Sequence, residues 1–156
     1  GFLGDPSGKC TCSQQQIQNY HKKLSGPILD RIDLTINVDK ITCNNLDTHY
    51  SAMHTRATEH NVVKKTITDS TALQAVRYRN PLLSNSTLSP QQIHQYLHPT
   101  PAAKKLLNTA SSELDLSNRS YFKVLKVAQT IADLDKVEQI QPEHISEALS
   151  LRQRLK

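Results

Sequence analysis

Residues 116–134 read LSNRSYFKVLKVAQTIADL, and this stretch decides the class of fold. Its apolar residues recur every three or four positions, which is the spacing of one helix face. They are Tyr121, Val124, Leu125, Ala128, Ile131 and Ala132. Ser117 is a preferred N-cap residue, so we predict a helix from Ser117 onward. Its apolar stripe faces a core, and Lys123, Lys126 and Asp133 fall on the other side.

The sequence on both sides of this stretch signals further helices. A capping residue followed by proline at the first helical position marks a helix start, as at Ser89-Pro90 and Thr100-Pro101, and Gln141-Pro142 opens the last helix. Ser13 and Gln16 have the spacing of a capping box, which predicts a short helix to about Leu24. The fold class is therefore mainly α, with a helical bundle over residues 89–156.

One strand interrupts this helical pattern. Ile32, Leu34, Ile36 and Val38 alternate with polar residues, a period of two that predicts a half-buried strand. A single strand cannot pair its own backbone groups, so we expect its partner strands in another part of a longer protein. The absence of an initiator methionine agrees with that expectation.

The positive charge of the chain lies in its middle. The net charge is +5, and residues 48–110 account for all of it, with seven basic and two acidic side chains. A helix is expected from about residue 49 to 79, with a possible break at the threonines around residue 68. Lys64, Lys65, Arg77 and Arg79 are the candidate nucleic-acid contacts, and a solvated helix face is the equally weighted alternative.

Several functions are excluded by missing motifs. No GxxxxGK[ST], HExxH or CxxC pattern occurs, so the chain cannot by itself cradle a nucleoside triphosphate. No apolar run approaches the roughly 18 residues of a membrane span. An odd number of cysteines, three, argues for a reducing compartment, and we expect a cytoplasmic protein without a membrane contact.

Residues 24–34, LSGPILDRIDL, place Arg31 beside Asp30 and Asp33, whose carboxylates can orient its guanidinium. This segment resembles the "SGPLLDRIDL" of the magnesium-chelatase-like branch of AAA+ ATPases, of the ComM/YifB type. The resemblance implies that Arg31 is an arginine finger that reaches the ATP of a neighbouring subunit. The alternative is an arginine held in a structural salt bridge.

Residues 116–134 and 140–149 resemble the lid of the same family, "LSxRxYxRxLKVARTIADL…IxPEHxxEA". The resemblance implies that Arg119 is the sensor 2 residue, acting on the ATP of its own subunit or of a neighbour. Gln129 stands where the family commonly has arginine, and we interpret this as the loss of a surface cation. Thr71 likewise stands where we expect an arginine in the middle segment.

The resemblance implies three segments: residues 1–47 as the end of the AAA+ core, residues 48–88 as a basic helical region and linker, and residues 89–156 as the lid. The longer protein would be a homo-oligomeric, hexameric ring that uses ATP and Mg²⁺ and acts on DNA in branch migration, recombination and competence. No cofactor is expected on this chain itself. Cys10 and Cys12 match the second half of a family CPCG…CxC element and are weak zinc candidates, with free thiols as the alternative.

Two other functions stay open at this point. The basic middle segment is compatible with a stand-alone helical module that binds nucleic acid. The family resemblance also includes true magnesium chelatase subunits, although the ending of the chain is more similar to the ComM type.

Overall fold

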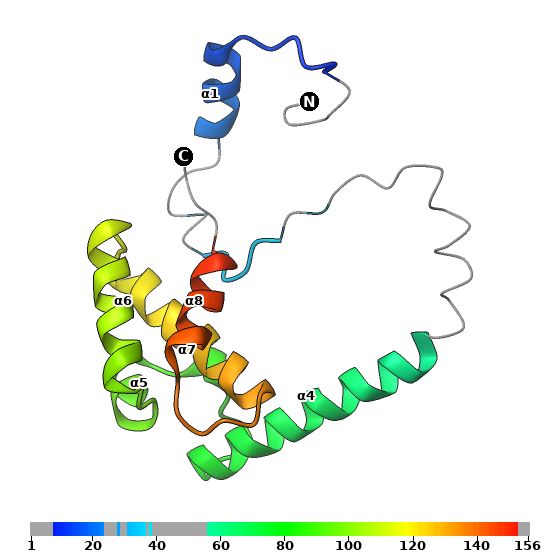
Figure 1. The fold of residues 1–156 in the computed structure, drawn as a ribbon, viewed down its shortest axis with the longest axis vertical. Helices are drawn as coiled ribbons and strands as arrows, with labels where there is room; N and C mark the ends of the chain where they lie inside the picture. Colours follow the sequence, from blue (N-terminus) through cyan, green and yellow to red (C-terminus); the bar gives the residue numbers. More distant parts are fainter. Residues whose placement is uncertain (1–7, 24–27, 29–30, 37, 39–55, 153–156) are drawn as a thin grey trace. The chain divides into compact units, whose positions relative to one another are not determined.

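The computed structural model describes residues 8–23, 28, 31–36, 38 and 56–152. The chain divides into two compact units, residues 1–32 and residues 33–156, and each is described by itself. The described residues are mainly helical, as predicted (Figure 1). The three segments with boundaries after residues 47 and 88 stay a prediction.

The first unit contains one described helix, α1 (Gln14–Lys22). The predicted capping box is present: the Ser13 backbone N–H donates to Gln16 Oε1 at 2.8 Å, and Ser13 Oγ accepts from the Gln16 N–H at 3.3 Å. The helix ends near Lys22, and Leu24 lies outside the described residues. No residue of α1 is buried, and 68% of Tyr20 is exposed.

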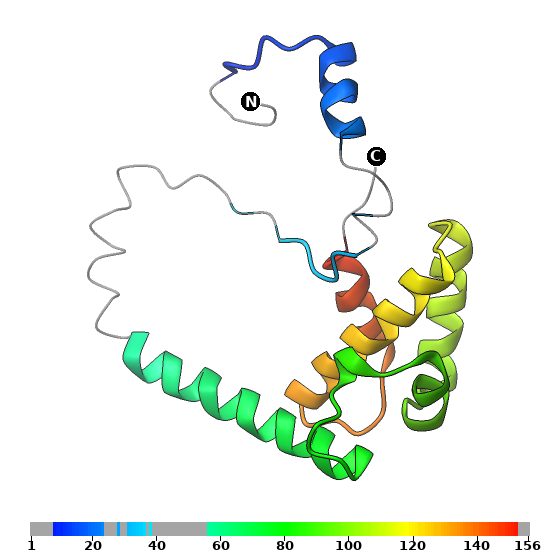
Figure 2. The same ribbon diagram turned by 180° about the vertical axis from the view of Figure 1, so that it is seen from behind.

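The second unit is built around α7 (Asn118–Leu134), which contacts almost every other element (Figure 2). The other elements are α4 (Arg56–Tyr78), the 3₁₀ turn η3 (Asn85–Thr87), α5 (Pro90–Tyr96), α6 (Pro101–Glu113) and α8 (Pro142–Ser150). Helix α8 packs against both α7 and α6, while α4, α5 and η3 pack against α7. The helix starts predicted at residues 89–90, 100–101 and 141–142 are therefore confirmed.

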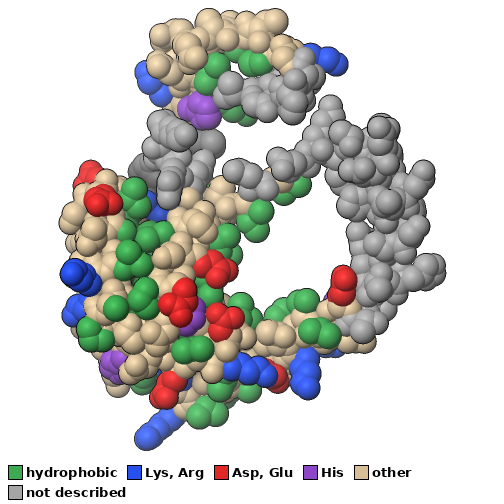
Figure 3. All heavy atoms as spheres, in the orientation of Figure 1, with side chains coloured by type: hydrophobic (Ala, Val, Ile, Leu, Met, Phe, Trp, Pro, Cys, Tyr) green, Lys and Arg blue, Asp and Glu red, His purple; other side chains and the backbone are tan. Residues whose placement is uncertain are grey.

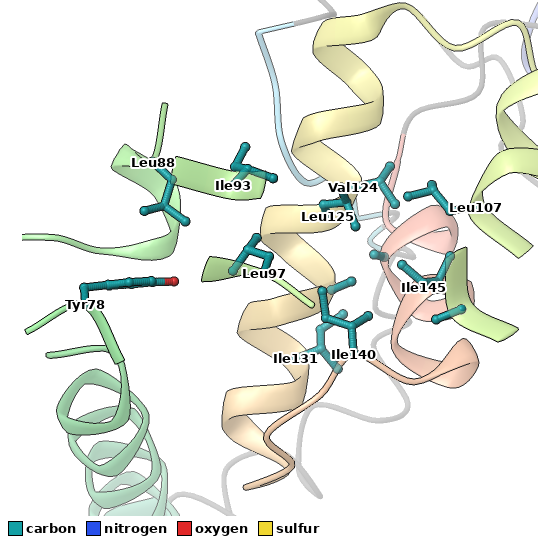
Figure 4. Close-up of a cluster of buried hydrophobic side chains, with 13 residues drawn as sticks. Tyr78, Leu88, Ile93, Leu97, Leu107, Val124, Leu125, Ile131, Ile140 and Ile145 are labelled. Atoms are coloured by element: carbon teal, nitrogen blue, oxygen red, sulfur yellow. The ribbon is translucent and has the colours of Figure 1, made fainter. Parts of the chain in front are cut away.

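The core lies between α7 and the helices around it (Figure 4). The predicted stripe of α7 supplies Val124, Leu125, Ala128 and Ile131 to this core. The largest fully buried apolar side chains are Ile93, Leu107, Ile140 and Ile145. Each such side chain contributes about 1.5–3 kcal/mol to folding through the hydrophobic effect, and this unit therefore has a core of its own.

Helix α4 is continuous through its threonine-rich centre, so the predicted possible break is wrong. The hydroxyl groups of Thr66, Thr68 and Thr71 each donate to the carbonyl four residues earlier, at 2.8–3.0 Å. Each hydroxyl thus bonds to a carbonyl of the helix itself, so the threonines are accommodated without a break in α4. Residues 49–55 of the predicted helix lie outside the described residues.

Three helices of this unit end in the same way without glycine. Arg79, Asp115 and Lys136, with φ of 51°, 47° and 60°, take the left-handed conformation just after α4, α6 and α7. After each of them the next amide bonds back to a carbonyl five residues earlier, at 2.8–3.3 Å. This is the Schellman arrangement, which glycine usually completes because other residues pay a steric cost in that conformation.

The predicted strand is absent from the described residues 32–36 and 38. Nor is the segment half-buried on its apolar side, since Ile32, Leu34, Ile36 and Val38 are 47–88% exposed. Strand structure needs a neighbouring backbone to pair with, and the part of the chain that the structure describes contains no second strand. The amide of Thr35 instead donates to the carbonyl of Leu151 at 2.7 Å.

Two side chains of α7 that we expected at the surface are buried. Gln129 and Asp133 are each only 1% exposed, so both expectations are wrong. They lie four residues apart on the flank of α7 that faces the end of α4 and η3. Residues 80–88, the end of the segment expected as a basic helical region and linker, contain η3 and bury Asn85 and Leu88.

Candidate functional site

The first turn of α7 presents an exposed arginine. Ser117 caps the helix by accepting from the Ser120 N–H at 3.2 Å, and Arg119 is the second helical residue. Ser120 Oγ also accepts from Arg152 Nη2 at 3.0 Å, which ties this turn to the end of α8. Arg119 is exposed. A helix N-terminus carries a partial positive charge. Arg119 adds a full positive charge at the same end of α7, so this end favours binding of a phosphate group.

Arg31 lies in the first unit, where its backbone N–H donates to the Ile28 carbonyl at 2.9 Å. The residue is exposed, and its role as an arginine finger stays a prediction. Asp30, one of the two residues predicted to orient it, lies outside the described residues.

Asp33 contacts a lysine of the lid. Its Oδ1 lies 2.6 Å from Nζ of Lys123, in the second turn of α7. Lys126 lies one turn further along and donates from Nζ to the Ser86 carbonyl at 3.0 Å. Burial lowers the pKa of Lys126 below its ordinary value, and the charge of Lys123 adds to this while Asp33 opposes it. The orienting role of Asp33 toward Arg31 stays a prediction.

A buried polar network surrounds Asp133, and the sequence analysis missed it. Both carboxylate oxygens accept from the guanidinium of Arg77, and one of these two bonds measures 3.1 Å. The carboxylate also accepts from Asn85 Nδ2 at 2.9 Å and from Gln129 Nε2 at 3.0 Å. Asn85 in turn accepts from the hydroxyl of Tyr78. The spacing of Leu125, Gln129 and Asp133, four residues each, is the sequence signal for one shared helix face.

This network decides how Arg77, a predicted nucleic-acid contact, is used. Burial alone would lower the pKa of Arg77, but the hydrogen bonds and charges of Asp133 and Tyr78 raise it above its ordinary value. Only 17% of the side chain is exposed. The planar guanidinium is occupied in a bidentate pair with Asp133, and a nucleic-acid contact of Arg77 stays a prediction.

The remaining predicted cations are exposed. Lys64 and Lys65 lie on the part of α4 that precedes its contact with α7, and Arg79 follows the last turn. Figure 3 shows basic and apolar side chains side by side along this helix. The exposed apolar residues here include Val62, Val63 and Ile67.

Cys10 is partly exposed and Cys12 is exposed, both as free thiols in the first unit. Within the described ranges, no three histidine, cysteine or acidic side chains gather as a metal ion would require. The weak zinc candidacy of Cys10 and Cys12 stays a prediction. The helices of the described part include none long and apolar enough to cross a membrane.

Two matches to known protein families cover most of the chain. Residues 57–152 match the family described as magnesium chelatase, subunit ChlI C-terminal, and residues 1–46 match magnesium chelatase, subunit ChlI. The chain belongs to the magnesium chelatase ChlI family. The resemblance inferred from residues 24–34 and 116–149 is thereby confirmed. In this ChlI-family chain the C-terminal match covers all of α5, α6, α7 and α8.

Individual members resemble the chain over most of its length. It is 35% identical to YifB of Salmonella typhimurium over 143 residues, 33% identical to the competence protein ComM of Haemophilus influenzae over 140 residues, and 32% identical to YifB of Escherichia coli over 141 residues. Each match covers 90% of this ChlI-family chain. The chain spans 26% of the length of each of these relatives.

Proposed function

We propose that this chain is the C-terminal part of an AAA+ ATPase that forms a ring of identical subunits and acts on DNA. In this proposal Arg31 is the finger that contacts ATP on a neighbouring subunit, and Arg119 is the sensor 2 residue of the lid. The observation that carries the proposal is the exposure of both arginines within family motifs. One relative is named as a competence protein, and this name supports the proposed role in competence.

The residues present fit contact with ATP phosphates but not retention of the nucleotide. Guanidinium groups donate parallel hydrogen bonds to phosphate oxygens, and Arg119 stands at a helix N-terminus that favours anions. No glycine-rich phosphate loop occurs in the sequence. ATP with Mg²⁺, held by other parts of the longer protein, would supply the phosphoryl group to be transferred. Arg31 and Arg119 would stabilise the charge that develops on it.

The sensor assignment predicts a loss of hydrolysis without a comparable loss of binding. In the full-length protein, Arg119→Ala should lower kcat for ATP by about 10²- to 10³-fold, in the range of other removed transition-state donors. The Kd for a non-hydrolysed ATP analogue should change by less than about tenfold, since the arginine acts mainly on charge that develops in the reaction.

Lys104→Ala is the matched control for this variant. It removes one exposed cation from α6, away from the first turn of α7, and should leave both constants unchanged. A wild-type kcat in Arg119→Ala would contradict the sensor role. Equal effects of Arg119→Ala and Lys104→Ala would mean that only the total positive charge of the protein affects hydrolysis.

A second candidate is nucleic-acid binding by this chain alone, favoured by the exposure of Lys64 and Lys65 on α4. If α4 tracks a phosphate backbone, Lys64→Gln with Lys65→Gln should weaken binding of labelled duplex DNA. It should also reduce the slope of log K against log salt by about one for each lysine. The measurement is a titration of the 156-residue chain at several salt concentrations.

The pair Lys104 and Lys105 on α6 provides an equal change of charge at another exposed position. The Lys104→Gln, Lys105→Gln variant should keep most of the affinity. Equal losses in both double variants would mean attraction to net charge rather than a contact through α4. Tight, salt-dependent binding by the chain alone would favour the stand-alone module over the motor subunit.

We also propose a cytoplasmic location, supported by the free thiols of Cys10 and Cys12.

A further inference from the structure

The ammonium group of Lys123 is buried beside the carboxylate of Asp33, and among the described residues it has no hydrogen-bond partner beyond this ion pair. Its Nζ atom has no appreciable surface exposed to solvent, although 20% of the whole side chain is exposed. Asp33 Oδ1 lies 2.6 Å away, and 58% of the Asp33 side chain is exposed. A buried ammonium is costly unless an opposite charge compensates it. Loss of the ion pair would therefore cost more free energy at the buried ammonium of Lys123 than at the exposed carboxylate of Asp33.

A backbone hydrogen bond holds the same segment at a second point. Two residues after Asp33, the Thr35 N–H donates to the carbonyl of Leu151 at 2.7 Å. Leu151 is the C-cap residue of α8, and carbonyls at a helix end have no partner within the helix. Arg152 Nη2, the next residue, reaches Ser120 of α7 at 3.0 Å. Residues 33–35 are thus joined to the start of α7 and the end of α8.

The two residues of the ion pair stand next to the two proposed ATP contacts in sequence. Asp33 follows Arg31 by two residues, and Lys123 follows Arg119 by four residues, one helical turn along the same face of α7. We infer that Lys123 is a positioning residue that couples the lid helix bearing Arg119 to the segment bearing Arg31. This inference rests on the proposed ATPase function.

The coupling has a direct mechanical meaning. When Arg119 engages or releases phosphate, α7 shifts as a rigid helix, and the buried ammonium carries Asp33 with it because separation would leave Lys123 uncompensated. The position of the finger then depends on the nucleotide state sensed by the lid. Such coupling between sites is a free energy, with typical effects of about 5- to 150-fold.

The test uses the full-length protein with Lys123→Met, which keeps the length of the side chain and removes its charge. We expect hydrogen exchange at the Thr35 amide to accelerate about tenfold or more, and kcat for ATP to fall about tenfold with KM little changed. Lys123→Arg should retain both properties. Asp33→Asn combined with Lys123→Met should be no worse than either single variant, because both remove the same interaction.

Lys136→Met is the matched control. Lys136 pairs with Asp69 at 3.2 Å, is 64% exposed and lies just beyond the other end of α7, so its loss should change neither exchange at Thr35 nor kcat. If Lys123→Met does not fold, Asp33→Asn tests the same pair from its exposed side.

The possible failures are distinguishable. Wild-type exchange and kcat in Lys123→Met, in a protein where Arg31→Ala stops hydrolysis, would overturn the coupling and leave the ATPase assignment intact. Accelerated exchange with unchanged kcat would make the pair a structural tie only, and would also overturn the inference. Wild-type hydrolysis in Arg31→Ala would remove the proposed function on which the coupling rests.

Discussion

Replacing Arg31 with alanine is expected to lower the rate of ATP hydrolysis by the full-length protein by about 10³- to 10⁵-fold, the range known for arginine fingers. The physical reason is that a guanidinium placed against the transferring phosphoryl group stabilises the charge that builds up on its oxygens. Binding of ATP should change far less, because the finger contributes mainly to the transition state. The measurement is steady-state hydrolysis together with the Kd for a non-hydrolysed ATP analogue.

Two further variants separate the finger role from simple charge. Arg31→Lys keeps the positive charge but lacks the planar fork that pairs with phosphate oxygens, so we expect it to recover little activity. Lys22→Ala removes an exposed cation from the same unit and should have no effect. Wild-type turnover in Arg31→Ala would return Arg31 to the alternative of a structural salt bridge.

The finger is also expected to act between subunits. A subunit with Arg31→Ala keeps an intact nucleotide site, while a subunit that cannot bind ATP keeps an intact finger. Mixing the two inactive variants should therefore restore part of the hydrolysis, since some interfaces combine one working site with one working finger. No recovery in assembled mixed rings would place the finger within its own subunit.

The bundle was predictable because its boundaries carry local signals. Ser89, Thr100 and Ser117 each accept from the backbone N–H three residues on, as their positions before a helix indicated. The helix ends were less predictable. All four glycines of the chain lie within residues 1–26, so Arg79, Asp115 and Lys136 complete the later helix ends without the usual signal.

The errors came from features that depend on distant residues. The alternation over residues 32–38 is a genuine strand pattern, but strand formation depends on a partner that the described residues do not contain. Asp133 and Gln129 look like surface residues when α7 is considered alone. Asp133 is buried because Arg77 and Asn85, more than forty residues away in sequence, donate hydrogen bonds to it, and Gln129 donates to the same carboxylate.

The candidate site was found in sequence only through its motifs. Arg31 and Arg119 stand out because the segments around them resemble a family, while their own environment is an exposed surface. The contact of Lys123 with Asp33 gave no sequence signal, because the helical pattern places Lys123 only outside the apolar stripe and the family motif shows only that a basic residue is usual there. The contact with Asp33 joins residues 90 positions apart in sequence, and helical periodicity cannot predict contacts between such distant residues.

Asp133→Ala should lower the free energy of unfolding of this chain by about 3–5 kcal/mol, the cost of removing one partner from a buried ion pair. The guanidinium of Arg77 and the amide group of Gln129 would lose their acceptor, and the amide group of Asn85 would keep only Thr130. An unsatisfied buried donor loses its hydrogen bonds to water without replacement. Chemical denaturation followed by circular dichroism measures the change.

The exposed pair Asp69–Lys136 is a matched control, since it joins the same helix α4 to the residue after the end of α7. Because both side chains are exposed, Asp69→Ala should cost less than about 1 kcal/mol. Arg77→Met combined with Asp133→Leu should recover much of the stability lost in Asp133→Ala, because apolar side chains of similar size need no partners. A loss in Asp133→Ala no larger than in Asp69→Ala would mean that the network does not fix α4 to the lid. The orientation of Lys64 and Lys65 would then not depend on Asp133.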